Sequence, residues 1–289
     1  TVINTSVNNG SNTILGNGAD GDCTAAAGEG CYVWKVAEPG VSETVKIRVS
    51  DANDATSKAL SAQFQIRPII TVVTPNAGTE IWGVGSPQTV SWTTVGSLAT
   101  MKLEYSTNGF ANEAQTTTIS TPANLGATGA CTAPAGGGCY VWTIPDAISA
   151  PGTTSVKVRA SDPAVSASND LSNSPFRIVG GLTMTAPNGA EPWPVGTTQT
   201  ITWNKAGTVA NVNLFYTTNG SSWTTIKASA VNGSNTDNGG CTAGAGTGCY
   251  KWVLPDSIST TTKVRVVDVN DPDGKDESDA NFKIQADLT

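Results

Sequence analysis

A pair of cysteines separated by seven residues occurs three times in this chain, and Tyr-x-Trp follows the second cysteine of each pair. The pairs are Cys23 and Cys31, Cys131 and Cys139, and Cys241 and Cys249. One spacing used by all six cysteines predicts a tandem repeat in which each repeat carries its own short disulfide. Cysteines paired in this way are typical of an oxidising compartment, so we expect an extracellular or cell-surface protein.

The alternative use of such cysteines is a metal site or a redox centre. Zinc sites usually use closer cysteine pairs, often with histidine, and this chain contains no histidine. The residues between the cysteines are mainly Thr, Ala and Gly, and they form neither a Cys-x-x-Cys motif nor a cationic setting that would activate a thiolate. The sequence therefore favours structural disulfides.

Alignment on the cysteines defines two complete units, residues 69–179 and 182–286, and one partial unit, residues 1–67. Each complete unit has about 110 residues, the usual size of a two-sheet β-sandwich. Apolar residues alternate with polar ones in several segments, such as 89–92 and 156–160, as half-buried antiparallel strands require. We therefore expect an all-β chain of tandem antiparallel β-sandwiches with one disulfide per repeat.

Residues 1–67 correspond only to the second half of a complete unit. Half a sandwich would leave an apolar face and strand edges uncovered, which rarely persists in water. Two explanations stay open: the segment was cut from a longer array, or a neighbouring chain supplies the missing strands in trans.

The joints between units are short. Only a few residues around Pro68 and around Gly180-Gly181 separate the last strand of one unit from the first strand of the next. Without a long linker the units are expected to form a fairly stiff rod, with the Gly180-Gly181 joint looser than the Pro68 joint.

Charge and composition exclude several function classes. The formal net charge is −7, which makes nucleic acid an unfavourable partner. There is no apolar run long enough to span a membrane in this segment. The chain has neither a Gly-x-Ser-x-Gly nucleophile motif nor a phosphate-binding loop, so we do not expect an enzyme.

One acidic loop could bind a cation. Asp268, Asn270, Asp271 and Asp273 offer several oxygen ligands within a few residues, which suits Ca²⁺. The corresponding loops of the other two units are sparser, which argues against an obligatory site. Calcium at this loop is the one cofactor that the sequence suggests.

Three tryptophans lie in turn-like contexts rather than on alternating strands: Trp82, Trp193 and Trp223. They could be exposed platforms for sugar rings. The competing interpretation, which we favour, is that they cap the ends of the sandwiches, because large aromatic side chains are mostly buried.

Both complete units open on the same motif, which reads Pro-Asn, then Glu-x-Trp-x-Val-Gly, then Gln-Thr-Val/Ile-x-Trp, at Pro75–Trp92 and Pro187–Trp203. A Val-Lys-Val-Arg-x-Ser-Asp run at 156–162 and a closing Phe-x-Ile follow. This pattern resembles the Ig-like repeat of the Ser/Thr-rich cell-wall family, which includes KNH-like β-glucan assembly proteins of fungi and their bacterial relatives. The resemblance implies secreted or surface-exposed Ig-like or fibronectin-III-like sandwiches and assigns no catalytic residues.

Together these features predict a structural repeat segment of an extracellular surface protein: a stalk, an adhesin or a filament subunit, with strand complementation as a route to polymerisation. Its expected partners are other copies of itself, neighbouring repeats of a longer chain or a cell-surface polysaccharide. The alternative is a set of non-catalytic carbohydrate-binding modules attached to a secreted enzyme, for which an exposed Trp82, Trp193 or Trp223 would speak.

Overall fold

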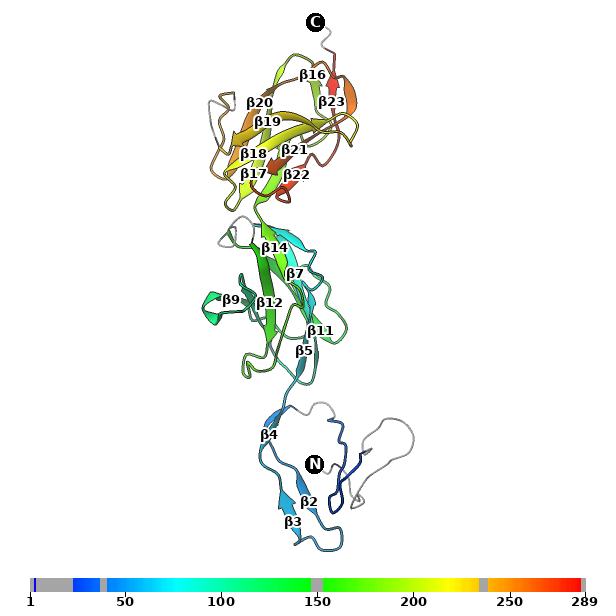
Figure 1. Ribbon diagram of the computed structural model, residues 1–289. Coiled ribbons are helices and arrows are strands. Elements are labelled where there is room, and N and C mark those ends of the chain that lie inside the picture. The colour runs from blue at the N-terminus through cyan, green and yellow to red at the C-terminus, as the bar shows by residue number, and fades with distance from the viewer. Residues whose placement is uncertain (1–2, 4–22, 37–40, 147–152, 234–238, 287–289) are drawn as a thin grey trace.

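The computed structural model describes residue 3 and residues 23–36, 41–146, 153–233 and 239–286. Three units lie end to end (Figure 1), and we call them unit 1 (described residues up to 67), unit 2 (residues 69–179) and unit 3 (residues 181–286). Among the described residues no helix is long and apolar enough to cross a membrane. The described elements are strands, apart from one 3-10 turn, η1 (Glu113–Gln115).

Unit 2 is a sandwich of two sheets. The first sheet has the strand order β10-β11-β7-β5. Its strands are β5 (Ile69–Thr74), β7 (Pro87–Val95), β10 (Gly126–Thr128) and β11 (Gly137–Thr143). The second sheet has the order β6-β14-β12-β8-β9, with β13 paired to β12. Its strands are β6 (Ile81–Gly83), β8 (Lys102–Ser106), β9 (Thr116–Ser120), β12 (Thr153–Ser161), β13 (Asn169–Leu171) and β14 (Phe176–Val179).

Unit 3 repeats this plan. Its first sheet has the order β15-β17-β20 and its second the order β16-β23-β21-β18-β19, with β22 paired to β21. The strands of the first sheet are β15 (Gly181–Ala186), β17 (Thr198–Ala206) and β20 (Thr247–Val253). Those of the second are β16 (Pro192–Pro194), β18 (Asn211–Thr217), β19 (Thr224–Val231), β21 (Ser259–Asp268), β22 (Lys275–Glu277) and β23 (Phe282–Gln285).

Alternation of side chains along the strands builds the two cores. In β17, Ile201 and Trp203 are fully buried while Thr200 and Asn204 face solvent. Trp92 of β7 occupies the same place in unit 2. Burial of one indole removes about 200 Å² from water, worth roughly 5 kcal/mol as an upper figure. A tryptophan at the centre of each sandwich is therefore a large part of what holds its two sheets together.

Some strand pairs differ from the purely antiparallel sheets that the sequence predicted. β6 pairs with β14, and β16 with β23, in parallel. β10 also lies parallel to β11. Each of these ladders aligns only three residue pairs, so an alternating sequence pattern is too short there to indicate strand direction.

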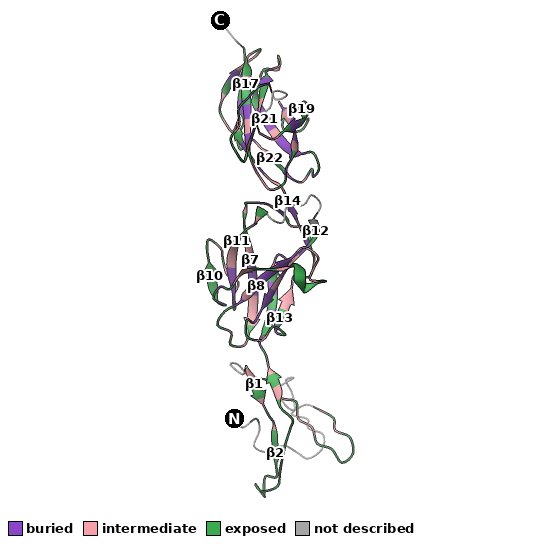
Figure 2. Ribbon diagram, turned by 90° about the vertical axis from the view of Figure 1, so that its left-hand side faces the viewer, coloured by how far each residue is buried: buried purple, intermediate pink, exposed green. Residues whose placement is uncertain are grey.

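Unit 1 contains four short strands, β1 (Ser42–Val45), β2 (Arg48–Ser50), β3 (Lys58–Leu60) and β4 (Phe64–Ile66). β1 pairs with β4 and β2 with β3, which reproduces the pairing of β12 with β14 and β13 in unit 2. The N–H of Ile47 donates to Ser61 Oγ at 2.9 Å, as Val158 does to Ser172 at 3.2 Å. Unit 1 thus folds the same last hairpin as the complete units. Figure 2 shows buried residues gathered in units 2 and 3 and mostly exposed ones in unit 1.

The joint between units 2 and 3 is closely packed, contrary to the expectation that its glycines loosen it. Only Gly180 separates β14 from β15. A Cβ on Gly180 would lie 2.3 Å from Val209 Cγ2, and one on Gly181 would lie 2.1 Å from the carbonyl oxygen of Val84. These glycines therefore permit close contact between the units, which is the second common use of a residue without a side chain.

Candidate functional site

The three predicted disulfides form. Cys23 pairs with Cys31, Cys131 with Cys139 and Cys241 with Cys249, and their Cα atoms lie 6.0, 6.2 and 6.1 Å apart. No described cysteine is free. Each bond joins the start of a strand, or of the segment equivalent to it, to the loop before it, so it is a local clasp rather than a bridge between sheets. Cys139 and Cys249 are buried, which suits a structural role.

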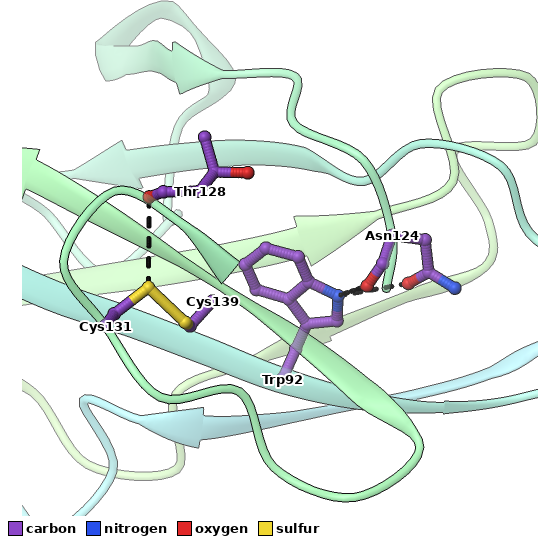
Figure 3. The surroundings of a disulfide bond; sticks show 5 residues. All are labelled: Trp92, Asn124, Thr128, Cys131 and Cys139. Carbon is purple, nitrogen blue, oxygen red and sulfur yellow. Dashed lines mark hydrogen bonds between the residues drawn. A yellow bond between two sulfur atoms is a disulfide. The ribbon is translucent and has the colours of Figure 1, made fainter. Parts of the chain in front are cut away.

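A glycine precedes the second cysteine of each pair, and the structure shows why. Trp92 lies beside the disulfide of unit 2 (Figure 3) and donates its indole N–H to Asn124. A Cβ on Gly138 would lie 2.6 Å from the Trp92 ring, and one on Gly248 would lie 2.2 Å from the Trp203 ring. The core tryptophan of each complete unit therefore packs against the Gly-Cys pair, and we call this pair the tryptophan seat. Sequence reasoning missed this contact, although the glycine recurs as Gly30, Gly138 and Gly248.

Trp82 and Trp193 are buried, so the alternative of exposed sugar platforms is wrong for them, and their burial agrees with the interpretation we favoured, that they cap the ends of the sandwiches. Trp82 packs on Phe176 with ring centroids 4.5 Å apart, and Trp193 packs on Phe282 at 5.0 Å. They lie on β6 and β16, the short strands that pair with the last strand of each unit, and they close the end of each core.

Trp223 is half-buried, and one ring face is covered. The Arg265 guanidinium lies 3.7 Å from the ring centroid. Arg265 also pairs with Glu277 at 2.7 Å. A stacked guanidinium occupies the place that a sugar ring would take on that face.

The acidic loop after β21 contacts unit 2. Arg177 of β14 donates to both carboxylate oxygens of Asp271, at 3.1 and 3.0 Å, and also pairs with Asp273. The side chain of Asp271 is only 5% exposed, whereas that of Arg177 is 33% exposed. Burial acts against the charge on Arg177, but the carboxylates raise its pKa. We call this contact the Arg177 clamp.

The other two predicted calcium ligands play local roles. Asp268 accepts a hydrogen bond from the N–H of Asn270 at 2.9 Å, and burial raises the pKa of the Asp268 carboxyl. A raised pKa is unfavourable for a calcium ligand, which must be ionised. In the part of the chain that the structure describes, no group of three or more His, Cys, Asp or Glu side chains is arranged to hold a metal ion. Calcium at this loop stays a prediction.

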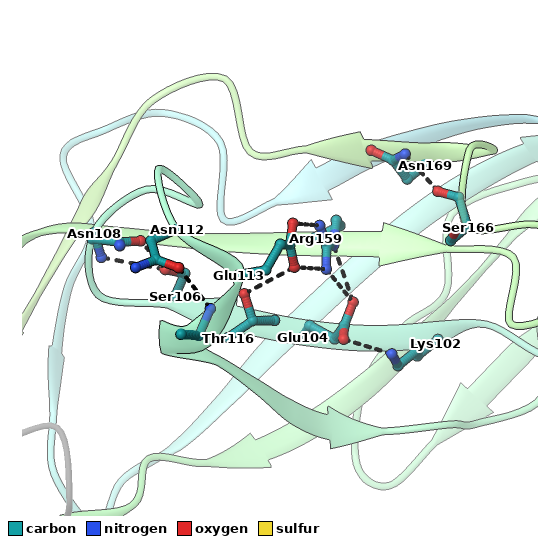
Figure 4. Close-up of polar contacts among 11 residues, drawn as sticks. Lys102, Glu104, Ser106, Asn108, Asn112, Glu113, Thr116, Arg159, Ser166 and Asn169 are labelled. Atoms are coloured by element: carbon teal, nitrogen blue, oxygen red, sulfur yellow. Dashed lines mark hydrogen bonds and ion pairs between the residues drawn. The ribbon is translucent and has the colours of Figure 1, made fainter.

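A second ionic group lies on the outer face of unit 2 (Figure 4). Arg159 of β12 donates to Glu104 at 3.0 Å and to both oxygens of Glu113, at 2.7 and 2.9 Å. The hydrogen bond from Arg159 lowers the pKa of the Glu113 carboxyl. Phe110 lies 4.6 Å below the guanidinium. This ion-pair network therefore joins a buried carboxylate, Glu104, to the exposed carboxylate of Glu113 through Arg159.

The motif that opens each complete unit serves structural purposes throughout. Glu80 accepts backbone N–H bonds from Asn76 and Ala77 at 2.8 and 2.9 Å, and Glu191 does the same for Asn188 and Gly189. Burial acts to raise the pKa of Glu80, but these backbone hydrogen bonds hold it below its usual value. The described contacts of Glu80 and Glu191 are therefore structural.

The strand order places β5, β7 and β11 in one sheet and β14, β12 and β8 in the other, which is the arrangement of an Ig-like sandwich. The chain is therefore a tandem array of Ig-like or fibronectin-III-like units. No family model matches it, and no curated protein matches it.

Solved structures that match are tandem domains of the same general kind. One holds fibronectin(III)-like modules of CbhA from Clostridium thermocellum, with 15% identity, a TM-score of 0.22, and coverage of 75% of this chain and 94% of that one. A three-domain titin segment has 9% identity, a TM-score of 0.26, and coverage of 88% and 78%. The three N-terminal domains of the bacteriophage RB49 Highly Immunogenic Outer Capsid protein have 10% identity, a TM-score of 0.24, and coverage of 88% and 82%. Scores this low carry no argument about function.

Proposed function

We propose that this chain is a structural repeat segment of an extracellular surface protein, in which Ig-like units form a stiff stalk or filament. The Arg177 clamp carries the proposal. It joins the last strand of unit 2 to a loop of unit 3, beside the glycines that let the two units touch. A chain of independent binding modules would not need such a contact. Neighbouring domains are expected to move relative to one another unless their interface is large and hydrophobic.

The clamp is specific to one joint. Gln65 occupies the Arg177 position in unit 1, and Val165 and Ala167 occupy the Asp271 and Asp273 positions in unit 2. The joint between units 1 and 2 therefore has no equivalent ion pair at these positions. It instead places Pro68 and Val41 against Gly96 of unit 2. Each joint carries its own contacts, which suits a protein in which the order of units is fixed.

The disulfides support an extracellular location, since bonds of this kind persist in oxidising compartments. The opening motif supports the resemblance to the Ser/Thr-rich cell-wall type of Ig-like repeat. Its residues Glu80, Trp82 and Trp92 make contacts that hold the unit together, so the same residues could have the same structural role in other repeats of this type. A surface polysaccharide and other copies of the chain are the partners that such a role would bring, and an adhesin is one form of it.

The clamp is tested with Arg177→Ala in the full chain. The variant leaves the carboxylate of Asp271 in a buried position without its cation, and we expect unit 3 to lose about 1–2 kcal/mol, less than for a fully buried pair because Arg177 is partly exposed. Small-angle X-ray scattering should show a narrow distribution of extended shapes for the original chain and a broader one for the variant.

Arg67→Ala is the matched control, because Arg67 lies at the other joint and its guanidinium donates to Gln65 of the same strand region at 2.5 and 2.9 Å. It should leave both measurements unchanged. If the original chain already scatters as units that tumble independently, the rod is wrong.

A further inference from the structure

In units 2 and 3 the strand that carries Cys-Tyr-x-Trp is covered along its length by a second strand with a core tryptophan. β11 pairs with β7 over seven residues, and β20 pairs with β17 over seven. The pairing sets Gly138 opposite Trp92 and Gly248 opposite Trp203. We call the segment that contains the tryptophan-bearing strand, β7 or β17, and the strands before and after it along the chain the front half of a unit.

The equivalent segment of unit 1, residues 31–36, forms no strand; Val33 and Val36 are exposed there, and Tyr32 and Trp34 are only half-buried. Val36 is 45% exposed, whereas its counterparts Ile144 and Leu254 are 1% and 2% exposed. Val49 is 69% exposed, whereas Ala160 and Val266 are fully buried. We define the open face as Gly30, Trp34, Val36, Ile47 and Val49, all of which match core positions of the complete units.

Gly30 indicates what covers this face. It is exposed, so nothing in the described part of unit 1 requires a residue without a side chain there. In the complete units the same glycine is buried under an indole, and a Cβ would overlap the ring. Gly30 and the exposed apolar residues beside it form a surface on which a tryptophan-bearing strand from outside unit 1 could pack.

We propose that the open face of unit 1 binds the front half of another repeat of this type, with the tryptophan of that strand seated on Gly30. This rests on the proposed function and names the partner of unit 1. Both front halves of the described chain, around β7 and β17, already pair with their own back halves. The occupant is therefore a front half from outside the folded chain, and not one that a closed second copy could supply without opening a unit.

The probe is a synthetic peptide with the sequence of β17, residues 198–206, added to the full chain. We expect saturable binding, by fluorescence anisotropy of the labelled peptide, and slower hydrogen exchange at residues 31–36. A peptide with Trp203→Ala should bind at least tenfold more weakly, since it loses the side chain with the largest buried apolar area.

Gly30→Leu in the chain should abolish binding by filling the tryptophan seat. Ala27→Leu, which adds the same side chain to an exposed position of the same disulfide loop, should leave binding unchanged. The intact peptide failing to bind, or binding equally without its tryptophan or with Gly30→Leu, would overturn the proposal.

Sedimentation of the chain alone distinguishes the two possible sources of the covering strand, a second copy of this chain and a front half from outside it. A monomer is expected; a dimer that Gly30→Leu dissociates would show that a second copy covers the face and would overturn the assignment to an outside front half. None of these results alters the Arg177 clamp or the scattering of the rod, so a failure here is distinct from a failure of the proposed function.

Discussion

Replacing Trp203 with alanine is expected to lower the stability of unit 3 by about 3–5 kcal/mol. The indole is fully buried between the sheets and donates to Asn232 Oδ1 at 2.6 Å. The change creates a large cavity above Gly248, which has no side chain to fill it, and leaves an acceptor without its donor. Calorimetry of the full chain should show the transition of unit 3 shifted down by more than about 10 °C.

Trp223→Ala is the control for this variant, because it removes the same side chain from the surface of the same unit. Trp223 is half-buried beneath Arg265, so we expect a loss of about 1 kcal/mol or less. Equal destabilisation by the two variants would contradict the assignment of Trp203 to the centre of the core. The transition of unit 2 should move in neither.

Removing the disulfide of unit 2 with Cys131→Ala and Cys139→Ala together is expected to cost about 2.5 kcal/mol, the loop-closure value for a short loop. Alanine is preferred to serine because Cys139 is buried and a hydroxyl there would lose its solvation. Chemical denaturation followed by hydrogen exchange should show the loss in unit 2.

The matched control is Cys23→Ala with Cys31→Ala, which removes a bond of the same loop length from unit 1. It should leave the stability of unit 2 unchanged. An unaltered unit 2 after loss of Cys131 and Cys139 would mean that the disulfide neither stabilises the sandwich nor restricts its unfolded chain. Reduction of all three bonds by dithiothreitol should act in the same direction.

The repeat pattern was enough to predict the disulfides and the all-β units, because these follow from spacing and two-residue alternation. Of the tryptophans on alternating strands, which the same pattern predicts as core residues, Trp92, Trp142, Trp203 and Trp252 are buried, whereas Trp34 is only half-buried. Burial was harder to predict for residues outside alternating strands. Trp82 and Trp193 lie on three-residue strands, too short for alternation to indicate a buried face.

The contacts between units could not be predicted from sequence. Arg177 and Asp271 are 94 residues apart, and each alone reads as an ordinary surface charge. The expectation of a loose Gly180-Gly181 joint followed from the conformational freedom of glycine, but the opposite use of the residue, close approach, depends on Val209 and Val84 of neighbouring loops. The seat formed by Gly138 was equally hidden, since it depends on which residue of β7 lies opposite.

The parallel pairing of β6 with β14 and of β16 with β23 bears on how such a rod would respond to pulling. A force along its length draws the early strand of each unit towards one end and the last strand towards the other. Because these two strands run side by side in the same direction, their backbone hydrogen bonds, such as Lys283 to Glu191 at 2.9 Å and Val195 to Gln285 at 2.9 Å, are loaded sideways and together rather than one after another. The hydrogen bonds are thus loaded in shear, and separating the strands in this way requires a higher force than breaking the bonds one after another.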